Sequence, residues 1–190
     1  MTPSRLLFVS SATSYRNHAF IQAADTLQMP WMLVCDQSRL VAQDAHTSVL
    51  DFANPDAVVR AVAQFHAEMP FVAVLALDDS GAHIAVHIAQ ALNLPHNSLD
   101  ATTAARNKYV MRTALQRAPI KLPWFALFHS ATPLDEVIAQ VPWPCVIKPL
   151  ELNGSRGVMR VNTPAEFHQM HARLVRLLRE IYPDDQQHHY

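Results

Sequence analysis

Three short apolar runs, separated by stretches with helical periodicity, constrain the fold of this chain most strongly. The runs cover residues 6–9, 31–35 and 71–77, and none of them alternates with polar residues. Strands that are apolar on both faces are typical of a parallel sheet that helices cover on both sides. The pattern therefore predicts an α/β layer of Rossmann-like type, with a further short strand at residues 49–50. Helices are expected between the strands, over residues 17–28, 54–68 and 80–92.

A second domain is expected after Pro95, where this alternation ends. A helix is predicted from Asp100 or Thr102, either of which can cap it, to about residue 116. A strand is predicted over residues 124–128. These assignments divide the chain into an α/β domain over residues 1–97 and an α+β lobe over residues 98–190.

The second domain contains two helix starts with the same sequence signature. Thr-Pro-x-acid begins at Thr132 and again at Thr163; the Thr can cap the first turn, and the Pro stands at the first helical position. The second of these helices is expected to run to about Ile181. Between the two helices, residues 145–148 and 157–161 are predicted to pair as a hairpin.

Composition and charge exclude several classes of function. Fifteen Lys and Arg against 16 Asp and Glu give a formal charge of −1, which leaves no electrostatic footprint for nucleic acid. The longest apolar run, residues 71–77, is far shorter than the ~20 residues of a membrane-spanning helix, and no export signal follows Arg5. Cys35 and Cys145 lie inside apolar runs and are expected to be buried thiols in a reducing compartment. A cytoplasmic protein that binds neither nucleic acid nor membrane is therefore expected.

A glycine-bearing loop after a strand is the strongest candidate for a binding site. The chain has only three glycines, and two of them lie in this loop. The loop consists of Asn153, Gly154, Ser155, Arg156 and Gly157. Its backbone N–H groups can point toward an anion, with Lys148 at the end of the preceding strand as a counter-charge. An ordinary hairpin with a solvated lysine is the alternative, and neither a Walker loop nor a dinucleotide fingerprint occurs.

Two further pairs of side chains stand four residues apart and share a helix face. Lys108 and Arg112 would present two positive charges together, which by itself is typical of a solvated surface. His83 and His87 have the spacing of two zinc ligands, but the stretch His-Ile-Ala-Val-His lacks the general-base glutamate of zinc proteases and an obvious third ligand. No metal site is therefore predicted.

Asp78 and Asp79 follow the apolar strand at residues 71–77. The carboxyl edge of a parallel sheet is where α/β proteins bind ligands, so a role toward a substrate is one interpretation. Capping of the next helix is the other interpretation, and it is the one we favour.

Taken together, the two cationic stretches resemble a known family. Residues 104–161 resemble the amino-terminal part of an ATP-grasp domain. The resemblance rests on Ala-Arg-Asn-Lys-Tyr-Val-Met-Arg at 105–112, Leu-Pro-Trp-Phe at 122–125, Pro-Cys-Val-Ile-Lys-Pro-Leu at 144–150 and Asn-Gly-Ser-Arg-Gly-Val at 153–158. The preceding residues are similar to the pre-ATP-grasp domain of carboxylate–amine ligases and biotin-carboxylase-like enzymes, so the resemblance covers nearly the whole chain.

The resemblance implies roles for two lysines and a loop. Lys108 and Lys148 match the family lysines that contact the nucleotide phosphates. The loop that closes over the terminal phosphates is matched by Asn153, Gly154, Ser155, Arg156 and Gly157. This chain has Asn107 where many members carry Asp, and an uncharged side chain there is not expected to harm phosphate binding. The resemblance does not identify the catalytic residues.

ATP and Mg²⁺ are the cofactors that the resemblance implies. Members of the family phosphorylate a carboxylate with ATP, and an amine or similar nucleophile then attacks the acyl phosphate. The substrate implied is a small carboxylic or amino acid, with biotin-carboxylase-like and purine-pathway chemistries as alternatives. A non-catalytic nucleotide-binding or interaction module, which keeps the lysines and the loop without turnover, is the alternative from a different class.

The second lobe of an ATP-grasp domain, with its acidic and Asn metal ligands, is not recognised after the loop. Only Glu180, Asp184 and Asp185 follow Arg179 as acidic residues. We therefore expect a truncated chain that holds no metal ligand, binds nucleotide weakly and turns nothing over alone. A homo-oligomer or a complementing polypeptide is the expected protein partner.

Overall fold

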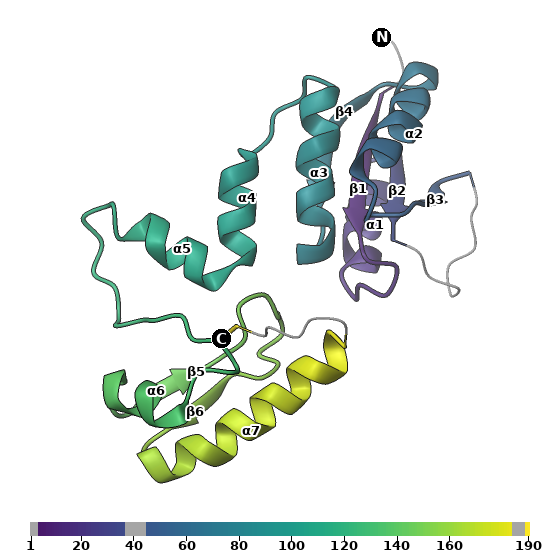
Figure 1. Cartoon of the computed structure of the whole chain (residues 1–190). Helices are drawn as coiled ribbons and strands as arrows, with labels where there is room; N and C mark the ends of the chain where they lie inside the picture. Colours follow the sequence, from purple (N-terminus) through teal and green to yellow (C-terminus); the bar gives the residue numbers. More distant parts are fainter. Residues whose placement is uncertain (1–3, 37–44, 184–188) are drawn as a thin grey trace. The chain divides into compact units, whose positions relative to one another are not determined.

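The computed structural model describes residues 4–36, 45–183 and 189–190, so Asp184 and Asp185 lie outside the described residues. The chain forms two compact units, Met1–Thr103 and Ala104–Tyr190 (Figure 1). The boundary expected between residues 97 and 98 lies shortly before this division. Among the described residues, none of the helices combines the length and the apolar character needed to cross a bilayer.

The first unit is built on a four-stranded parallel sheet in the order β3-β2-β1-β4. Its strands are β1 Arg5–Ser10, β2 Trp31–Cys35, β3 Thr47–Val49 and β4 Phe71–Ala76. The connecting helices are α1 Asn17–Thr26, α2 Pro55–Glu68 and α3 Asp79–Ala91. These elements confirm the predicted α/β sheet, with helix and strand ends within three residues of those expected.

Helices cover both faces of this sheet, as its fully apolar strands require. Leu7 and Val9 of β1 are buried in one cluster with residues of α2 and α3. Phe8, between them in the sequence, is buried on the opposite face with Ala24 of α1. The helix α3 comes so close to β1 that a Cβ atom on Gly81 would lie 2.2 Å from the carbonyl oxygen of Val9. Glycine is thus the residue that this contact allows.

Asp78, at the carboxyl edge of the sheet, holds the β1–α1 loop and α3 together. Its Oδ1 accepts a hydrogen bond from the Gly81 N–H at 3.0 Å, which caps α3 as predicted. Its Oδ2 accepts two bonds from Ser11, from the N–H at 2.9 Å and from the hydroxyl at 2.7 Å. Burial opposes ionisation of this carboxyl, but the hydrogen bonds from Ser11 and Gly81 outweigh it and lower the pKa of Asp78. The carboxylate therefore has a structural role.

The second unit combines helices with one short antiparallel hairpin. Its helices are α5 Lys108–Leu115, α6 Leu134–Gln140 and α7 Pro164–Ile181, and α4 Leu99–Arg106 crosses the division between the units. β5 Cys145–Ile147 pairs with β6 Met159–Val161, as predicted, with Cys145 opposite Val161. Phe167 and Leu174 of α7 are buried against the hairpin residue Ile147 in one apolar cluster.

The single helix predicted over residues 100–116 is wrong, because Asn107 divides it into α4 and α5. Asn107 has extended backbone angles, φ −104° and ψ 112°, and its side-chain oxygen accepts bonds from the N–H groups of Tyr109 and Val110 at 3.1 Å each. An asparagine that bonds the backbone ahead of it starts a new helix.

Two further predictions for this unit are corrected by the structure. The strand expected over residues 124–128 is not formed; within the described part of the chain, only Phe128 of this segment has strand-like bonds, which it exchanges with Tyr190 at 3.1 Å. Thr132 does not cap α6, because its hydroxyl accepts from the N–H of His129 and Pro133 takes the N-cap position. The matching signature at Thr163 does cap α7, with a 3.3 Å bond from the Glu166 N–H.

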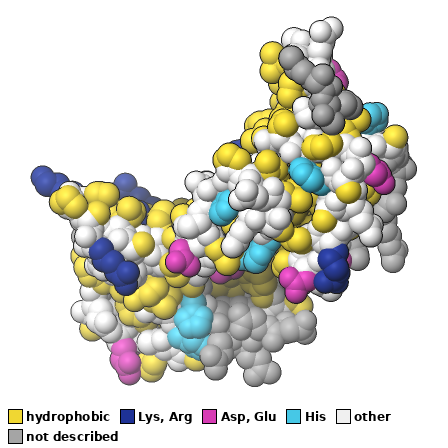
Figure 2. Space-filling model, turned by 90° about the horizontal axis from the view of Figure 1, so that it is seen from above, with side chains coloured by type: hydrophobic (Ala, Val, Ile, Leu, Met, Phe, Trp, Pro, Cys, Tyr) yellow, Lys and Arg dark blue, Asp and Glu magenta, His cyan; other side chains and the backbone are white. Residues whose placement is uncertain are grey.

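The surface carries exposed apolar side chains among small groups of charges. Leu75 of β4 and Val146 of β5 are exposed to 39% and 55%. On the face that Figure 2 shows, Lys and Arg side chains form small separate groups and not one continuous field.

Candidate functional site

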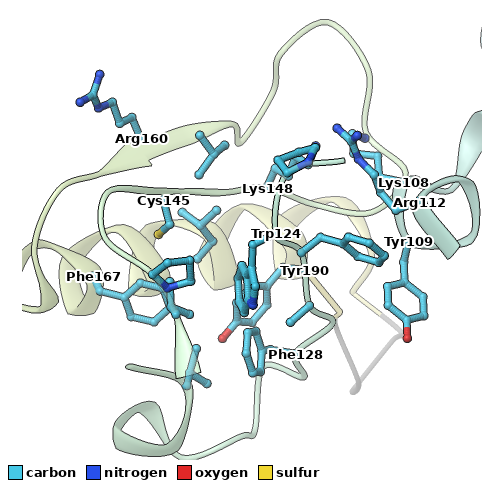
Figure 3. A pocket seen from close by; sticks show the side chains of 18 of the residues that line it. Lys108, Tyr109, Arg112, Trp124, Phe128, Cys145, Lys148, Arg160, Phe167 and Tyr190 are labelled. Carbon is cyan, nitrogen blue, oxygen red and sulfur yellow. The ribbon is translucent and has the colours of Figure 1, made fainter. Parts of the chain in front are cut away.

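The second unit contains a cavity of about 670 Å³ beside β5 (Figure 3). Its lining joins residues that lie far apart in the sequence, from α5, from the segment before α6 and from β5. Lys108, Arg112 and Lys148 supply positive charge, and Trp124 and Tyr190 are among the aromatic side chains in the wall. Both lysines predicted to contact phosphate thus line the same cavity.

Lys148 reaches the cavity because it follows β5 directly. The strand brings the chain from Cys145 to the buried Ile147, and Lys148 is half-buried at its end. Burial lowers the pKa of Lys148, and the positive charge of Arg112 lowers it further. An anion in the cavity would oppose both effects, because it favours the charged form of the lysine.

Lys108 occupies the first position of α5 and is tied to the chain that follows Lys148. Its Nζ donates to the carbonyl oxygens of Leu150 at 3.0 Å and Leu152 at 2.8 Å. Its backbone N–H also donates to the Leu150 oxygen, at 3.2 Å. These bonds fasten the start of the glycine-bearing loop to α5, so Lys108 positions backbone as well as supplying charge.

Asn107 also joins α5 to the loop. While its side-chain oxygen caps the helix, its Nδ2 donates to a carboxylate oxygen of Glu151 at 3.3 Å. An aspartate could still cap the helix, but it would place a second negative charge against Glu151. The contact with Glu151 therefore favours the uncharged asparagine over aspartate at position 107.

The loop residues themselves lie outside the cavity lining. Asn153, Gly154, Ser155 and Arg156 are exposed, and the Arg156 N–H bonds the Asn153 carbonyl at 3.2 Å within the loop. Gly157 is packed against α7: it has φ +73°, and a Cβ there would lie 2.9 Å from a methyl carbon of Leu177. The structure brings the two lysines together, and it does not bring this loop into the cavity.

The aromatic part of the wall was missed by the sequence reasoning. Trp124 belongs to the Leu-Pro-Trp-Phe stretch, which contributed to the resemblance without a role. Tyr190 had no sequence signal, because it enters the wall only by pairing with Phe128. Burial raises the pKa of Tyr190 to about 12.

The histidine pair His83 and His87 belongs to the first unit, whereas the residues that line the cavity belong to the second. The Nε2 atoms of His83 and His87 are 3.1 Å apart. Within residues 4–36, 45–183 and 189–190, no group of three or more His, Cys, Asp or Glu side chains is placed to hold a metal ion.

Comparison with known proteins connects this chain to one family. Residues 22–96 match the model of the ATP-grasp N-terminal domain. Among curated proteins, "Uncharacterized protein y4rH" of Sinorhizobium fredii (strain NBRC 101917 / NGR234) is 23% identical over 158 residues, which are 81% of this chain and 33% of that protein.

Two solved enzyme structures have a fold similar to that of this chain. The L-amino acid ligase of Bacillus licheniformis superposes with a TM-score of 0.64 at 21% identity, over 92% of this chain and 43% of that chain. The carboxyaminoimidazole ribonucleotide synthase of Aspergillus clavatus, solved with ATP, superposes with a TM-score of 0.66 at 18% identity, over 100% of this chain and 47% of that chain. This chain therefore spans less than half the length of these relatives. Residues 22–96 are thus similar to the ATP-grasp N-terminal domain, and the chain has the fold of the amino-terminal portion of these enzymes.

Proposed function

We propose that this chain forms the nucleotide-binding part of an ATP-grasp ligase, with Lys108 and Lys148 as phosphate ligands. The observation that carries the proposal is the cavity of the second unit, which has both lysines in its lining. Its volume of about 670 Å³ falls within the roughly 300–1,000 Å³ of small-molecule sites. Ammonium groups offset the charge of a triphosphate, and aromatic walls such as Trp124 offer faces on which a purine ring can stack.

The reaction that we propose is activation of a carboxylate. A substrate carboxylate oxygen bonds to the terminal phosphorus of ATP while the bond to ADP breaks, and a nucleophile such as an amine then displaces phosphate from the acyl carbon. Positioning and charge stabilisation catalyse most of such a phosphoryl transfer, and lysines at the phosphates supply charge. The substrate class proposed is a small carboxylic or amino acid, and the proposed partner is a second copy or a complementing polypeptide.

The loop over residues 153–157 enters the proposal as the segment that closes over the phosphates. Residues 153–156 are exposed, and Lys108 holds the chain before them through the carbonyls of Leu150 and Leu152. Gly154 and Ser155 have positive φ of 60° and 59°, which places two successive residues in the left-handed region. Mg²⁺ is implied by the family, but the described residues form no cluster of three or more His, Cys, Asp or Glu side chains that could hold it.

Binding of ATP to the 190-residue chain tests the proposal. Lys148→Ala should weaken ATP binding by about 10- to 100-fold, because a charge-assisted hydrogen bond contributes about 1.5–3 kcal/mol. Lys121→Ala removes an exposed lysine of the same unit and should leave the affinity unchanged. Isothermal titration calorimetry measures both. Equal ATP affinity of a folded Lys148→Ala variant and the parent chain would refute the assignment.

The competing hypothesis is that the site binds nucleotide without catalysing a reaction. A nucleotide-binding module would bind ATP through the lysines and never form ADP. Measuring ADP release from the protein with its complementing polypeptide and candidate amino acids separates the two functions, because only a ligase forms ADP in step with product.

A further inference from the structure

We propose that Arg112 is a phosphate-binding residue of this cavity and forms, with Lys148, the pair that first captures a polyphosphate. The inference rests on the proposed function, since it deepens the same site. The resemblance assigns no role to Arg112, and the sequence alone is equally compatible with a solvated helix face.

The start of α5 determines where Arg112 lies. Because Asn107 caps the helix, the helix begins at Lys108, and the residue four positions later returns to the same face. Lys108 and Arg112 accordingly both line the cavity, and Figure 3 shows them side by side near Lys148. Two helix positions and the end of a strand thus bring three cations to one side of the cavity.

Arg112 and Lys148 line the same cavity and lie near each other in Figure 3. The positive charge of Arg112 lowers the pKa of Lys148, in addition to the effect of burial. Within the described part of the chain, no hydrogen bond or ion pair joins either of the two to a carboxylate. Like charges held close together in a cavity favour an anion beside them, because each gains a counter-charge and the repulsion is relieved.

Lys108 is less available than this pair for the first contact with phosphate. Its Nζ already donates to the carbonyl oxygens of Leu150 and Leu152, at 3.0 and 2.8 Å. Binding phosphate through Lys108 would require exchange of these bonds. The guanidinium of Arg112 has a planar fork of donors that matches two phosphate oxygens at once.

Polyphosphate binding to the 190-residue chain tests the inference. The probes are ATP and inorganic tripolyphosphate, titrated separately by calorimetry into the parent chain and into Arg112→Gln. The variant should bind both probes at least about tenfold more weakly, and Arg112→Lys, which keeps the charge, should recover most of the affinity. The matched control is Arg173→Gln, which removes an exposed arginine of α7 that does not line the cavity and should change neither affinity.

A titration of Lys148 gives a second readout that does not depend on nucleotide. In a chain labelled with ¹³C-lysine, the Lys148 signal is identified by its loss in Lys148→Gln. Arg112→Gln should raise the pKa of Lys148, because it removes the nearby positive charge. An unchanged titration would overturn the inference, since the two side chains would then not lie close together in solution.

The outcomes separate this inference from the proposed function. If Lys148→Gln weakens ATP binding and Arg112→Gln leaves both probes within twofold of the parent chain, the inference is overturned and the proposed function stands. If tripolyphosphate binds in an Arg112-dependent way and ATP does not bind, the anion site stands and the nucleotide function is refuted. Binding of neither probe overturns both.

Discussion

Lys108 should stabilise the second unit even when no nucleotide is present. Its ammonium donates two hydrogen bonds to backbone carbonyls that lie 42 and 44 residues later in the chain. Lys108→Met keeps most of the apolar length of the side chain and removes both donors. Hydrogen bonds from charged groups contribute about 1.5–3 kcal/mol each, and for a half-buried lysine we take the lower end, about 3 kcal/mol for the two. Water can hydrate the released carbonyls in part, so the expected loss is about 2 kcal/mol.

Thermal unfolding measures this loss. For a unit of fewer than 100 residues, 1 kcal/mol corresponds to about 4–8 °C in Tm, so the transition of the second unit should fall by about 8–16 °C. Lys121→Met, at an exposed lysine of the same unit, is the matched control and should unfold like the parent chain. The first unit has its own core, so its transition should not move.

Hydrogen exchange locates the effect within the unit. Amides at residues 150–153 should exchange faster in Lys108→Met, because the loop start loses two of its bonds to α5. A variant whose second-unit Tm stays within about 2 °C of the parent chain would show that these bonds contribute little in solution. Lys108 would then be a phosphate ligand only, and its loss would change affinity without changing stability.

Two other predictions concern the first unit. Gly81→Ala should lower its free energy of unfolding by about 1–3 kcal/mol, because the new Cβ would lie 2.2 Å from the Val9 carbonyl oxygen and α3 must move away. Urea unfolding measures this loss, and an unchanged unfolding midpoint would contradict the prediction. The pKa of Asp78 is lower in the folded state than in the unfolded state, so its contribution is present above the unfolded value of about 3.8 and is lost as the pH falls through the folded pKa. Stability of the parent chain should therefore fall more steeply below about pH 4 than stability of Asp78→Asn; parallel acid-unfolding curves would exclude this role.

The sequence by itself determined the first unit almost completely. Its strands are apolar on both faces and its helices carry local start signals, such as Asn54, which accepts the Ala57 N–H at 3.2 Å, and Asp78. Both kinds of signal depend on neighbours a few residues away, and a sequence displays these directly. The same reasoning found the hairpin of β5 and β6 and the helix α7 capped by Thr163. The two lysines that line the cavity were singled out as phosphate ligands by the family resemblance, and that role stays a prediction.

Only the tertiary structure decided where the helices of the second unit begin and which of its segments pair. Asn107 divides a continuous helical pattern because its side chain bonds both α5 and Glu151, a contact over 44 residues. Residues 124–128 have a strand-like sequence, but their only strand-like bonds in the described chain are those of Phe128 with Tyr190. Local pattern cannot state which distant backbone will offer its hydrogen-bonding groups, because that depends on packing of the whole unit. For the same reason, only the fold brings Arg112 of α5 and Lys148, which follows β5, into the lining of one cavity.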